Sequence, residues 1–191
     1  LYYAVFVVSG FDGVRAHAEN IIQTLKKSGL PFCVFINKTD LSGSDSEKIR
    51  EDIERVSERK CLFISRSENE GSADVKIRER GANDFLAYAT AVLADINEEA
   101  EEVFLNDGVL KDGEITRIIR SSVFEERLIP VFSGSAKFSL GIKELAEGLI
   151  EYMPSSERRK TEELSGIIYK IERDKTFGKV AHIRMFEGEL T

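Results

Sequence analysis

Residues 31–40, PFCVFINKTD, decide the fold of this chain. Their first part, residues 31–37, is a continuous apolar run, which is typical of a strand buried on both faces of a parallel sheet. A similar run, YYAVFVV at residues 2–8, precedes it, and a helical pattern lies between the two. This strand–helix–strand order predicts two parallel strands joined by a right-handed crossover. The second strand ends in Asn37-Lys38-Thr39-Asp40, at the edge where open α/β sheets bind ligands.

The rest of the chain continues the alternation of helices and strands. Asp12 is predicted to cap the first helix and Gly29 to end it, while Ser44 and Glu47 have the spacing of a capping box for the second. Residues 66–81 are polar and contain glycine, which favours a loop. The remaining expected elements are a short strand at 61–65, helices at 83–104 and 112–122, a buried strand at 128–132, a helix at 140–152, and two strands at 166–171 and 179–186.

A second motif, Ser135-Ala136-Lys137, follows the strand at residues 128–132. With Asn37-Lys38-Thr39-Asp40 it predicts a pocket that reads guanine. Guanine presents N1–H and an exocyclic amine side by side, and an ionised Asp40 can accept both in one bidentate, charge-assisted pair. Adenine lacks this pair of donors, and buried polar groups left without partners discriminate strongly between ligands.

The other residues of the two motifs have complementary roles. Asn37 can bridge the base and a phosphate loop, and Lys38 can lay its aliphatic stem along one base face. Ala136 can donate its backbone N–H to O6, Lys137 can cover the opposite face, and Ser135 would tighten the turn. An isolated N-K-x-D sequence could also be a polar turn after a strand, and the second motif weakens that alternative. Residues 40–43 fit D-x-x-G only by coincidence, because Asp40 cannot face both a base and a metal.

Composition limits the class of protein. The chain has 191 residues, 42% hydrophobic and 32% charged, and a net charge of -7, which disfavours a dedicated nucleic-acid module. No apolar run approaches the ~20 residues that span a bilayer. Cys33 and Cys61 lie in apolar strands, so we expect buried free thiols in a reducing compartment. We expect the acidic run at 98–102 to be a solvated helix face, and His17 and His182 to lie at or near the surface.

Three segments carry a resemblance to a known family. Residues 7–40 resemble the matching part of elongation factor G-like translational GTPases, and among these the ribosomal-protection tetracycline resistance proteins most of all. Residues 131–154 resemble the final GTPase motif and last helix of that family. Residues 166–191 are similar to the opening of its second, β-barrel domain. The resemblance is weak across roughly residues 66–125, where the family carries a variable insertion.

The resemblance implies an α/β fold: a truncated P-loop GTPase (Ras-like) parallel sheet with a helical insertion, followed by the start of a β-barrel domain. It assigns residues 1–154 to the carboxyl-side part of the GTPase domain, with the insertion at about 66–127. Residues 155–164 would be a linker, and residues 165–191 the beginning of β-barrel domain II. Guanine-binding roles would fall on Asn37, Lys38, Asp40, Ser135, Ala136 and Lys137.

The resemblance further implies a cytoplasmic, Mg²⁺-dependent GTPase that binds the ribosome. The sequence has no G-x-x-x-x-G-K-[ST] phosphate loop. The family's phosphate loop, switch segments, Mg²⁺ ligands and catalytic His are all expected upstream of Leu1. We therefore expect no catalytic residue and no metal ligand here, with GTP or GDP and Mg²⁺ as cofactors of the parent protein. The chain alone is not expected to hydrolyse GTP, because phosphoryl transfer needs those groups.

Two other interpretations stay open. The chain could be a catalytically inert interaction module on a GTPase scaffold, or part of a GTPase outside translation, which the β-barrel opening disfavours. The sheet order of the family, 2-3-1-4-5-6, would make the strand at Tyr2–Val8 an exposed edge. An apolar edge invites pairing with another chain, so we expect self-association there or a repacked amino terminus.

Overall fold

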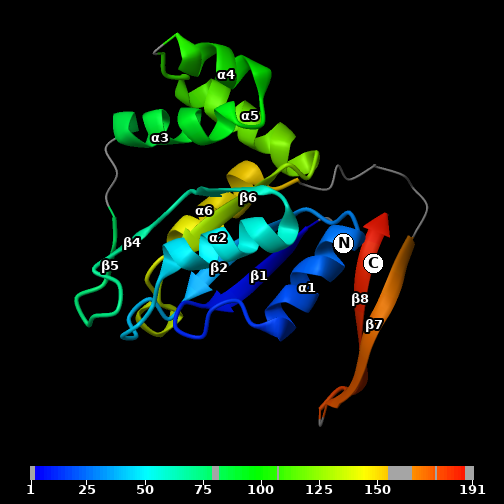
Figure 1. Ribbon diagram of the computed structural model, residues 1–191. Coiled ribbons are helices and arrows are strands. Elements are labelled where there is room, and N and C mark those ends of the chain that lie inside the picture. The colour runs from blue at the N-terminus through cyan, green and yellow to red at the C-terminus, as the bar shows by residue number, and fades with distance from the viewer. Residues whose placement is uncertain (1–2, 79–81, 107, 155–164, 175, 188–191) are drawn as a thin grey trace. The chain divides into compact units, whose positions relative to one another are not determined.

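The computed structural model describes all residues except 1–2, 79–81, 107, 155–164, 175 and 188–191. The chain divides into two units, Leu1–Ser155 and Ser156–Thr191. The first unit contains, in chain order, β1 (Ala4–Ser9), α1 (Ala16–Lys27), β2 (Phe32–Asn37), α2 (Ser46–Ser57), β3 (Lys60–Phe63), β4 (Ser67–Glu68), β5 (Lys76–Ile77), α3 (Ala82–Ala94), α4 (Glu98–Leu105), α5 (Asp112–Phe124), β6 (Leu128–Ser133), a 3₁₀ turn (Ala136–Phe138) and α6 (Ile142–Tyr152) (Figure 1).

The first unit is built on a parallel sheet with the strand order β1-β2-β6-β3. Ser9 lies opposite Asn37, and Ile36 lies opposite Ser133, so the carboxyl ends of β1, β2 and β6 meet at one edge. This arrangement confirms the predicted α/β class with a parallel sheet. It brings both predicted loops to the same end of neighbouring strands.

The sheet is covered on both faces because its central strands are apolar throughout. In β2, Phe32, Val34 and Ile36 pack in one core cluster with α1 and α2, while Cys33 and Phe35 pack in the other with α3, α5 and α6. Figure 1 shows α1 and α2 next to one another on one face of the sheet. Within the described residues both cysteines are free and buried, as predicted.

The strand at the amino-terminal edge differs from its prediction. Phe6 and Val8 of β1 are buried, but Val5 and Val7 on the opposite face are 37% and 56% exposed. The apolar run was expected to be buried on both faces. In the described structure β1 lies at the edge of its sheet and pairs only with β2, and Val5 and Val7 belong to neither core cluster.

The helix caps also differ in detail. The residue that caps α1 is Arg15, and Asp12 forms an ion pair with the Arg15 side chain. The predicted cap at Asp12 is therefore wrong. The cap of α2 is Asp45, whose side chain accepts a hydrogen bond from the backbone N–H of Lys48 at 2.9 Å. The predicted cap, Ser44, is wrong by one residue, because Ser44, Asp45 and Ser46 are all residue types that can cap a helix and the sequence does not distinguish them.

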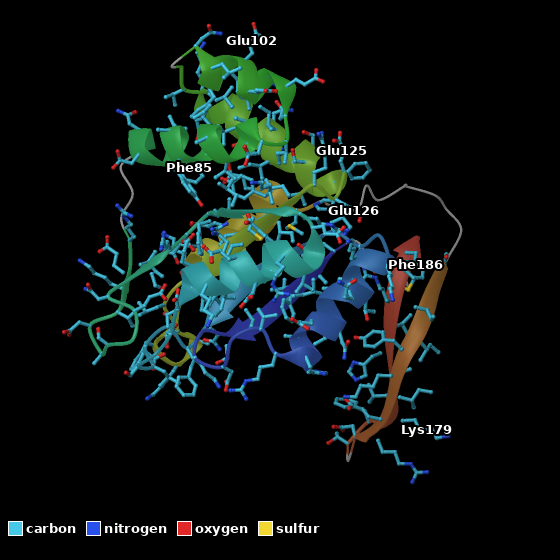
Figure 2. The ribbon with its side chains drawn as sticks, in the orientation of Figure 1. Phe85, Glu102, Glu125, Glu126, Lys179 and Phe186 are labelled. Atoms are coloured by element: carbon cyan, nitrogen blue, oxygen red, sulfur yellow. The ribbon has the colours of Figure 1, made fainter. Side chains whose placement is uncertain are left out.

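The helical insertion contains one more helix than predicted. The expected helix at 83–104 is interrupted, and Asn97 caps α4 by accepting from the N–H of Ala100 at 3.0 Å. The polar segment at 66–81, expected to be a loop, contains the short antiparallel pair β4–β5. In Figure 2, Phe85 points away from α4, and Glu102 points outward from α4 into open space. The acidic run is exposed, as a solvated face requires.

Helix α6 seats closely on β6. Leu145 and Leu149 are partly buried against the core and Met153 is buried, whereas Ile142 is 40% exposed. A β carbon added to Gly148 would lie 2.3 Å from Cζ of Phe132. Glycine therefore sets how near this helix approaches the strand.

The second unit is an antiparallel hairpin of β7 (Ser165–Asp174) and β8 (Gly178–Glu187), in agreement with the two predicted strands. Asp174 Oδ1 shapes its turn by accepting from the N–H groups of Thr176 and Phe177. Lys179 and Phe186 mark the two ends of β8 in Figure 2. The predicted linker, 155–164, lies outside the described residues. Across the described residues, no helix is both long and apolar enough to cross a membrane.

Candidate functional site

The two predicted loops meet at the carboxyl edge of the sheet. Asn37 ends β2, and its side-chain Oδ1 accepts hydrogen bonds from the backbone N–H of Lys38 at 2.8 Å and of Ala136 at 2.9 Å. The second bond joins residues that are 99 positions apart in sequence. It forms because β2 and β6 are parallel neighbours, so the loops that follow them leave the sheet side by side.

The backbone of the first loop is held in an unusual conformation. Lys38 has a φ of 65°, in the left-handed region that residues other than glycine rarely adopt unless their surroundings hold them there. The neighbouring Thr39 donates its N–H to Gly134 O at 3.2 Å, and Gly134 donates to Ile36 O at 2.9 Å. These bonds extend the pairing of β2 and β6 into the two loops.

The second loop is a closed turn between two glycines. Ser135 and Leu140 exchange both backbone hydrogen bonds, at 3.1 Å and 3.0 Å. A β carbon on Gly134 would lie 2.2 Å from Leu140 O, and one on Gly141 would lie 2.5 Å from Ser133 O. Sequence reasoning missed these supporting residues, although a glycine on each side of the motif was a visible signal of close backbone approach.

A small cavity of about 280 Å³ opens between the loops, lined by Asn37, Lys38, Asp40, Leu41, Ser135 and Lys137. Five of the six predicted site residues thus line one cavity. The sixth, Ala136, directs its N–H to Asn37 rather than into open space. If Ala136 also donates to O6 of guanine, as predicted, Asn37 Oδ1 and O6 would have to share this N–H. Two larger clefts, of about 950 and 880 Å³, contain none of these six residues.

The polar groups of this cavity include two without partners. In the described part of the chain, no hydrogen bond or ion pair engages the carboxylate of Asp40, which is partly exposed. The hydroxyl of Ser135 is buried and likewise has no hydrogen-bond partner among the described residues. A buried polar atom without a partner is costly, so this wall of the cavity suits a ligand that has hydrogen-bonding groups.

Cations flank the cavity. Lys38 Nζ lies 3.7 Å from Asp12 Oδ2, and Lys137 Nζ lies 5.0 Å from the centre of the Phe138 ring. The hydrogen bond with Ser9 chiefly lowers the pKa of Asp12, with Arg15 and Lys38 adding to the effect, so Asp12 stays ionised opposite Lys38. The lysine stems can cover a planar ligand while their ammonium groups stay in water.

Three buried hydroxyl groups lie behind the loops, and sequence reasoning missed them. Thr39 Oγ1 lies 3.2 Å from Ser67 Oγ, and Ser67 N–H donates to Ser133 Oγ at 2.7 Å. Thr39 occupies the variable position of N-K-x-D, and Ser67 belongs to the segment that was predicted to be a loop. No periodic pattern marks either residue.

Acidic, thiol and imidazole groups form no metal site in the described residues, where no group of three or more of them could hold an ion. His17 is exposed, and His182 pairs with Glu172 through Nε2 and Oε1 at 2.8 Å in the second unit.

Known proteins share the sequence pattern of this chain. Residues 1–155 match the family model of the elongation factor Tu GTP binding domain. The chain is 29% identical, over 98% of its length, to the tetracycline resistance protein TetP of Clostridium perfringens. It is 28% identical, over the same share, to TetM of Ureaplasma urealyticum. It spans 29% and 28% of the lengths of those two relatives.

A solved structure shares the fold. A crystal structure of a protein from Thermus thermophilus superimposes with a TM-score of 0.73 at 21% identity, over 98% of this chain and 32% of that one. The resemblance inferred from residues 7–40 and 131–154 is confirmed by these matches.

Proposed function

The chain belongs to the elongation factor Tu GTP binding domain family, and on this premise we propose that Asn37, Lys38, Asp40, Ser135, Ala136 and Lys137 read the guanine base of GTP or GDP. The protein would be a translational GTPase of the elongation factor G and tetracycline resistance type. The observation that carries this proposal is the single cavity that the two loops form around the unpaired carboxylate of Asp40.

The chemistry of the cavity suits a purine with two adjacent donors. Asp40 offers two acceptor oxygens to N1–H and the exocyclic amine of guanine, and such bidentate pairs are strong and directional. Lys38 and Lys137 line the cavity and can contribute their stems to the two base faces. At about 280 Å³ the cavity is slightly smaller than the ~300–1,000 Å³ of typical ligand pockets, which suits a base rather than a whole nucleotide.

We propose that this chain alone does not hydrolyse GTP. The sequence lacks the phosphate-loop motif, and the described residues hold no metal-binding cluster. Phosphates and Mg²⁺ would be bound by other residues of the parent protein, where they would supply the charge neutralisation that phosphoryl transfer requires. This chain would then contribute base recognition and the orientation of the nucleotide.

Calorimetry with GDP and ADP tests base recognition. We expect the longest encoded protein that contains this chain to bind GDP and to reject ADP, and the 191-residue chain to bind GDP weakly because it lacks contacts to phosphates. Equal affinity for the two nucleotides in the longer protein would overturn the proposed guanine site.

The relatives' names concern tetracycline resistance, and the sequence resembles the ribosomal-protection type of such proteins. We therefore propose that the parent protein acts on the ribosome in the cytoplasm. Residues 165–191 would open a β-barrel domain II, which agrees with the exposed apolar side chains of β7, such as Tyr169 at 68% and Ile171 at 66%. Co-sedimentation of the parent protein with ribosomes in the presence of a non-hydrolysable GTP analogue tests this partner. Failure to co-sediment under those conditions would count against it.

A second candidate function is that of a catalytically inert interaction module. This function is favoured by the hydrogen bond that the Ala136 N–H donates to Asn37 Oδ1, because an N–H that is already bonded is less available to a base. If the longer protein bound neither GDP nor GTP, the inert module would be the better description.

The edge of the sheet suggests one further partner. We propose that β1, whose Val5 and Val7 are exposed, pairs with a second chain when this 191-residue chain is isolated. Size-exclusion chromatography with light scattering should then show a dimer, and amides of residues 5–8 should exchange slowly. A monomer with fast exchange at those amides would contradict the pairing.

A further inference from the structure

The β4–β5 hairpin lies directly against the loop that carries Asp40. Thr39 Oγ1 lies 3.2 Å from Ser67 Oγ at the start of β4. Gly71, in the turn of the hairpin, donates its N–H to Thr39 O at 2.8 Å. Glu70 from the same turn accepts from the N–H of Ser46, the first residue of α2, at 3.0 Å. The hairpin therefore contacts the loop that follows β2 and the start of the next helix.

The same hairpin also contacts the end of β6. Ser67 donates its backbone N–H to Ser133 Oγ at 2.7 Å, and Ser133 Oγ lies 3.2 Å from Ser67 Oγ. Thr39 and Ser133 are 0% exposed and Ser67 is 5% exposed. One buried cluster of hydroxyl groups, formed by Thr39, Ser67 and Ser133, thus lies behind both recognition loops.

We propose that Ser67 is a positioning residue for guanine recognition, acting through Thr39 on the first loop and through Ser133 on the strand that precedes the second. This inference rests on the proposed guanine site. Thr39 stands between Lys38, whose backbone is in the left-handed region, and Asp40, whose carboxylate lines the cavity. The hydroxyl cluster fixes Thr39 from behind, so Asp40 is held in place before a base arrives.

Buried hydrogen bonds make this arrangement effective. A hydroxyl removed from the cluster leaves its partners without a bond in a region closed to water, which favours movement of the loop. A loop that has to be ordered during binding weakens affinity, because the ordering opposes association. Loss of Ser67 should therefore weaken the contacts of Asp40 without touching the base.

The test compares GDP with inosine diphosphate, whose base lacks the exocyclic amine that Asp40 would accept. The protein is the longest encoded one that contains this chain, and the variants are Ser67→Ala, Thr39→Val and Thr39→Ser. Thr39→Val keeps the shape and removes the hydroxyl, while Thr39→Ser keeps the hydroxyl. The matched control is Ser72→Ala, because the Ser72 hydroxyl donates to Asn69 O and accepts from the N–H of Asp74, two bonds that stay within residues 69–74.

We expect Ser67→Ala and Thr39→Val to weaken GDP binding about five-fold, the factor that one buried hydrogen bond of ordinary strength is worth. The preference for GDP over inosine diphosphate should also fall, but by less than this factor, because inosine diphosphate keeps the N1–H contact with Asp40 and lacks only the amine contact. Thr39→Ser and Ser72→Ala should stay within about two-fold of the natural protein.

Two results would overturn the inference in different ways. If Ser67→Ala and Thr39→Val keep the natural preference for GDP over inosine diphosphate, the hydroxyl cluster is only structural, and the guanine site stands. If the natural protein does not distinguish GDP from ADP, the guanine site itself is wrong. Because Thr39→Val replaces only the hydroxyl of Thr39 and Thr39→Ser removes only its methyl group, the comparison remains decisive even if Ser67→Ala fails to fold.

Discussion

Replacing Gly148 by alanine tests how α6 is seated on the sheet. The added β carbon would lie 2.3 Å from Cζ and 2.5 Å from Cε1 of Phe132, whose ring is completely buried. Because ordinary contacts begin near 3.4 Å, the helix or the ring must move by roughly 1 Å, and overpacking of this kind costs about 3 kcal/mol. Alanine in a helix interior returns about 1 kcal/mol through its better propensity. We therefore expect a net loss of about 2 kcal/mol in the free energy of unfolding.

Urea unfolding measures this loss, provided that the slope of the transition stays constant. The control is Gly113→Ala in α5, where an added β carbon meets nothing within 4 Å. This control should be neutral or stabilising by up to about 1 kcal/mol, because only propensity acts. A Gly148→Ala protein as stable as the Gly113→Ala protein would refute the reasoning. Phe132→Leu in the Gly148→Ala background should recover part of the loss by making room for the methyl group.

Three further predictions concern the base, a partly buried ion pair and the thiols. Asp40→Asn should lower GDP affinity at least about a hundred-fold, since two bonds to a charged acceptor are lost; competition with xanthosine diphosphate, whose base has an acceptor in place of the amine, should show the preference reversed. Arg59→Met leaves Glu126 without its partner, and the Arg59 side chain is only 8% exposed. Urea unfolding should therefore show a loss of about 2–3 kcal/mol in the free energy of unfolding, and a second change, Glu126→Gln, should restore part of it by removing the unpaired charge. Burial raises the pKa of Cys33 from 9.0 to about 12 and also raises the pKa of Cys61, so both thiols stay protonated in the folded protein. Their contribution to the free energy of unfolding should be fully present below about pH 9 and should decline as the pH rises toward about 12, because the unfolded thiols then lose their protons. Urea unfolding at about pH 8 and about pH 10.5 would detect this decline.

The sheet was predictable because its central strands carry an unambiguous signal. Residues 32–36 and 128–132 are apolar at successive positions. Such continuous apolar runs are typical of strands that are covered on both faces of a parallel sheet. The same reasoning failed at β1, where Val5 and Val7 belong to an equally apolar run but are exposed. Apolar composition reports what a strand can bury, and the neighbours of the strand decide whether it does.

The convergence of the two loops was also predictable, because parallel strands bring their carboxyl ends to one edge. The supporting hydroxyl groups were not, since Ser67 lies in a polar segment whose sequence shows no period. Its role depends on a contact with Ser133, 66 positions away, and such a contact is invisible to any local pattern. The break between α3 and α4 was missed for a related reason: Asn97 is compatible with a helix interior as well as with a cap.

The bond between Asn37 and Ala136 also has a consequence for how the molecule folds. The chain between these residues contains the whole helical insertion, and a loop of this size closes slowly because its ends must meet by a long search. The recognition loops can come together only after β6 has docked beside β2. Nucleotide binding should therefore emerge late in refolding, after the secondary structure has formed, and stopped-flow experiments with a fluorescent GDP analogue would record that delay.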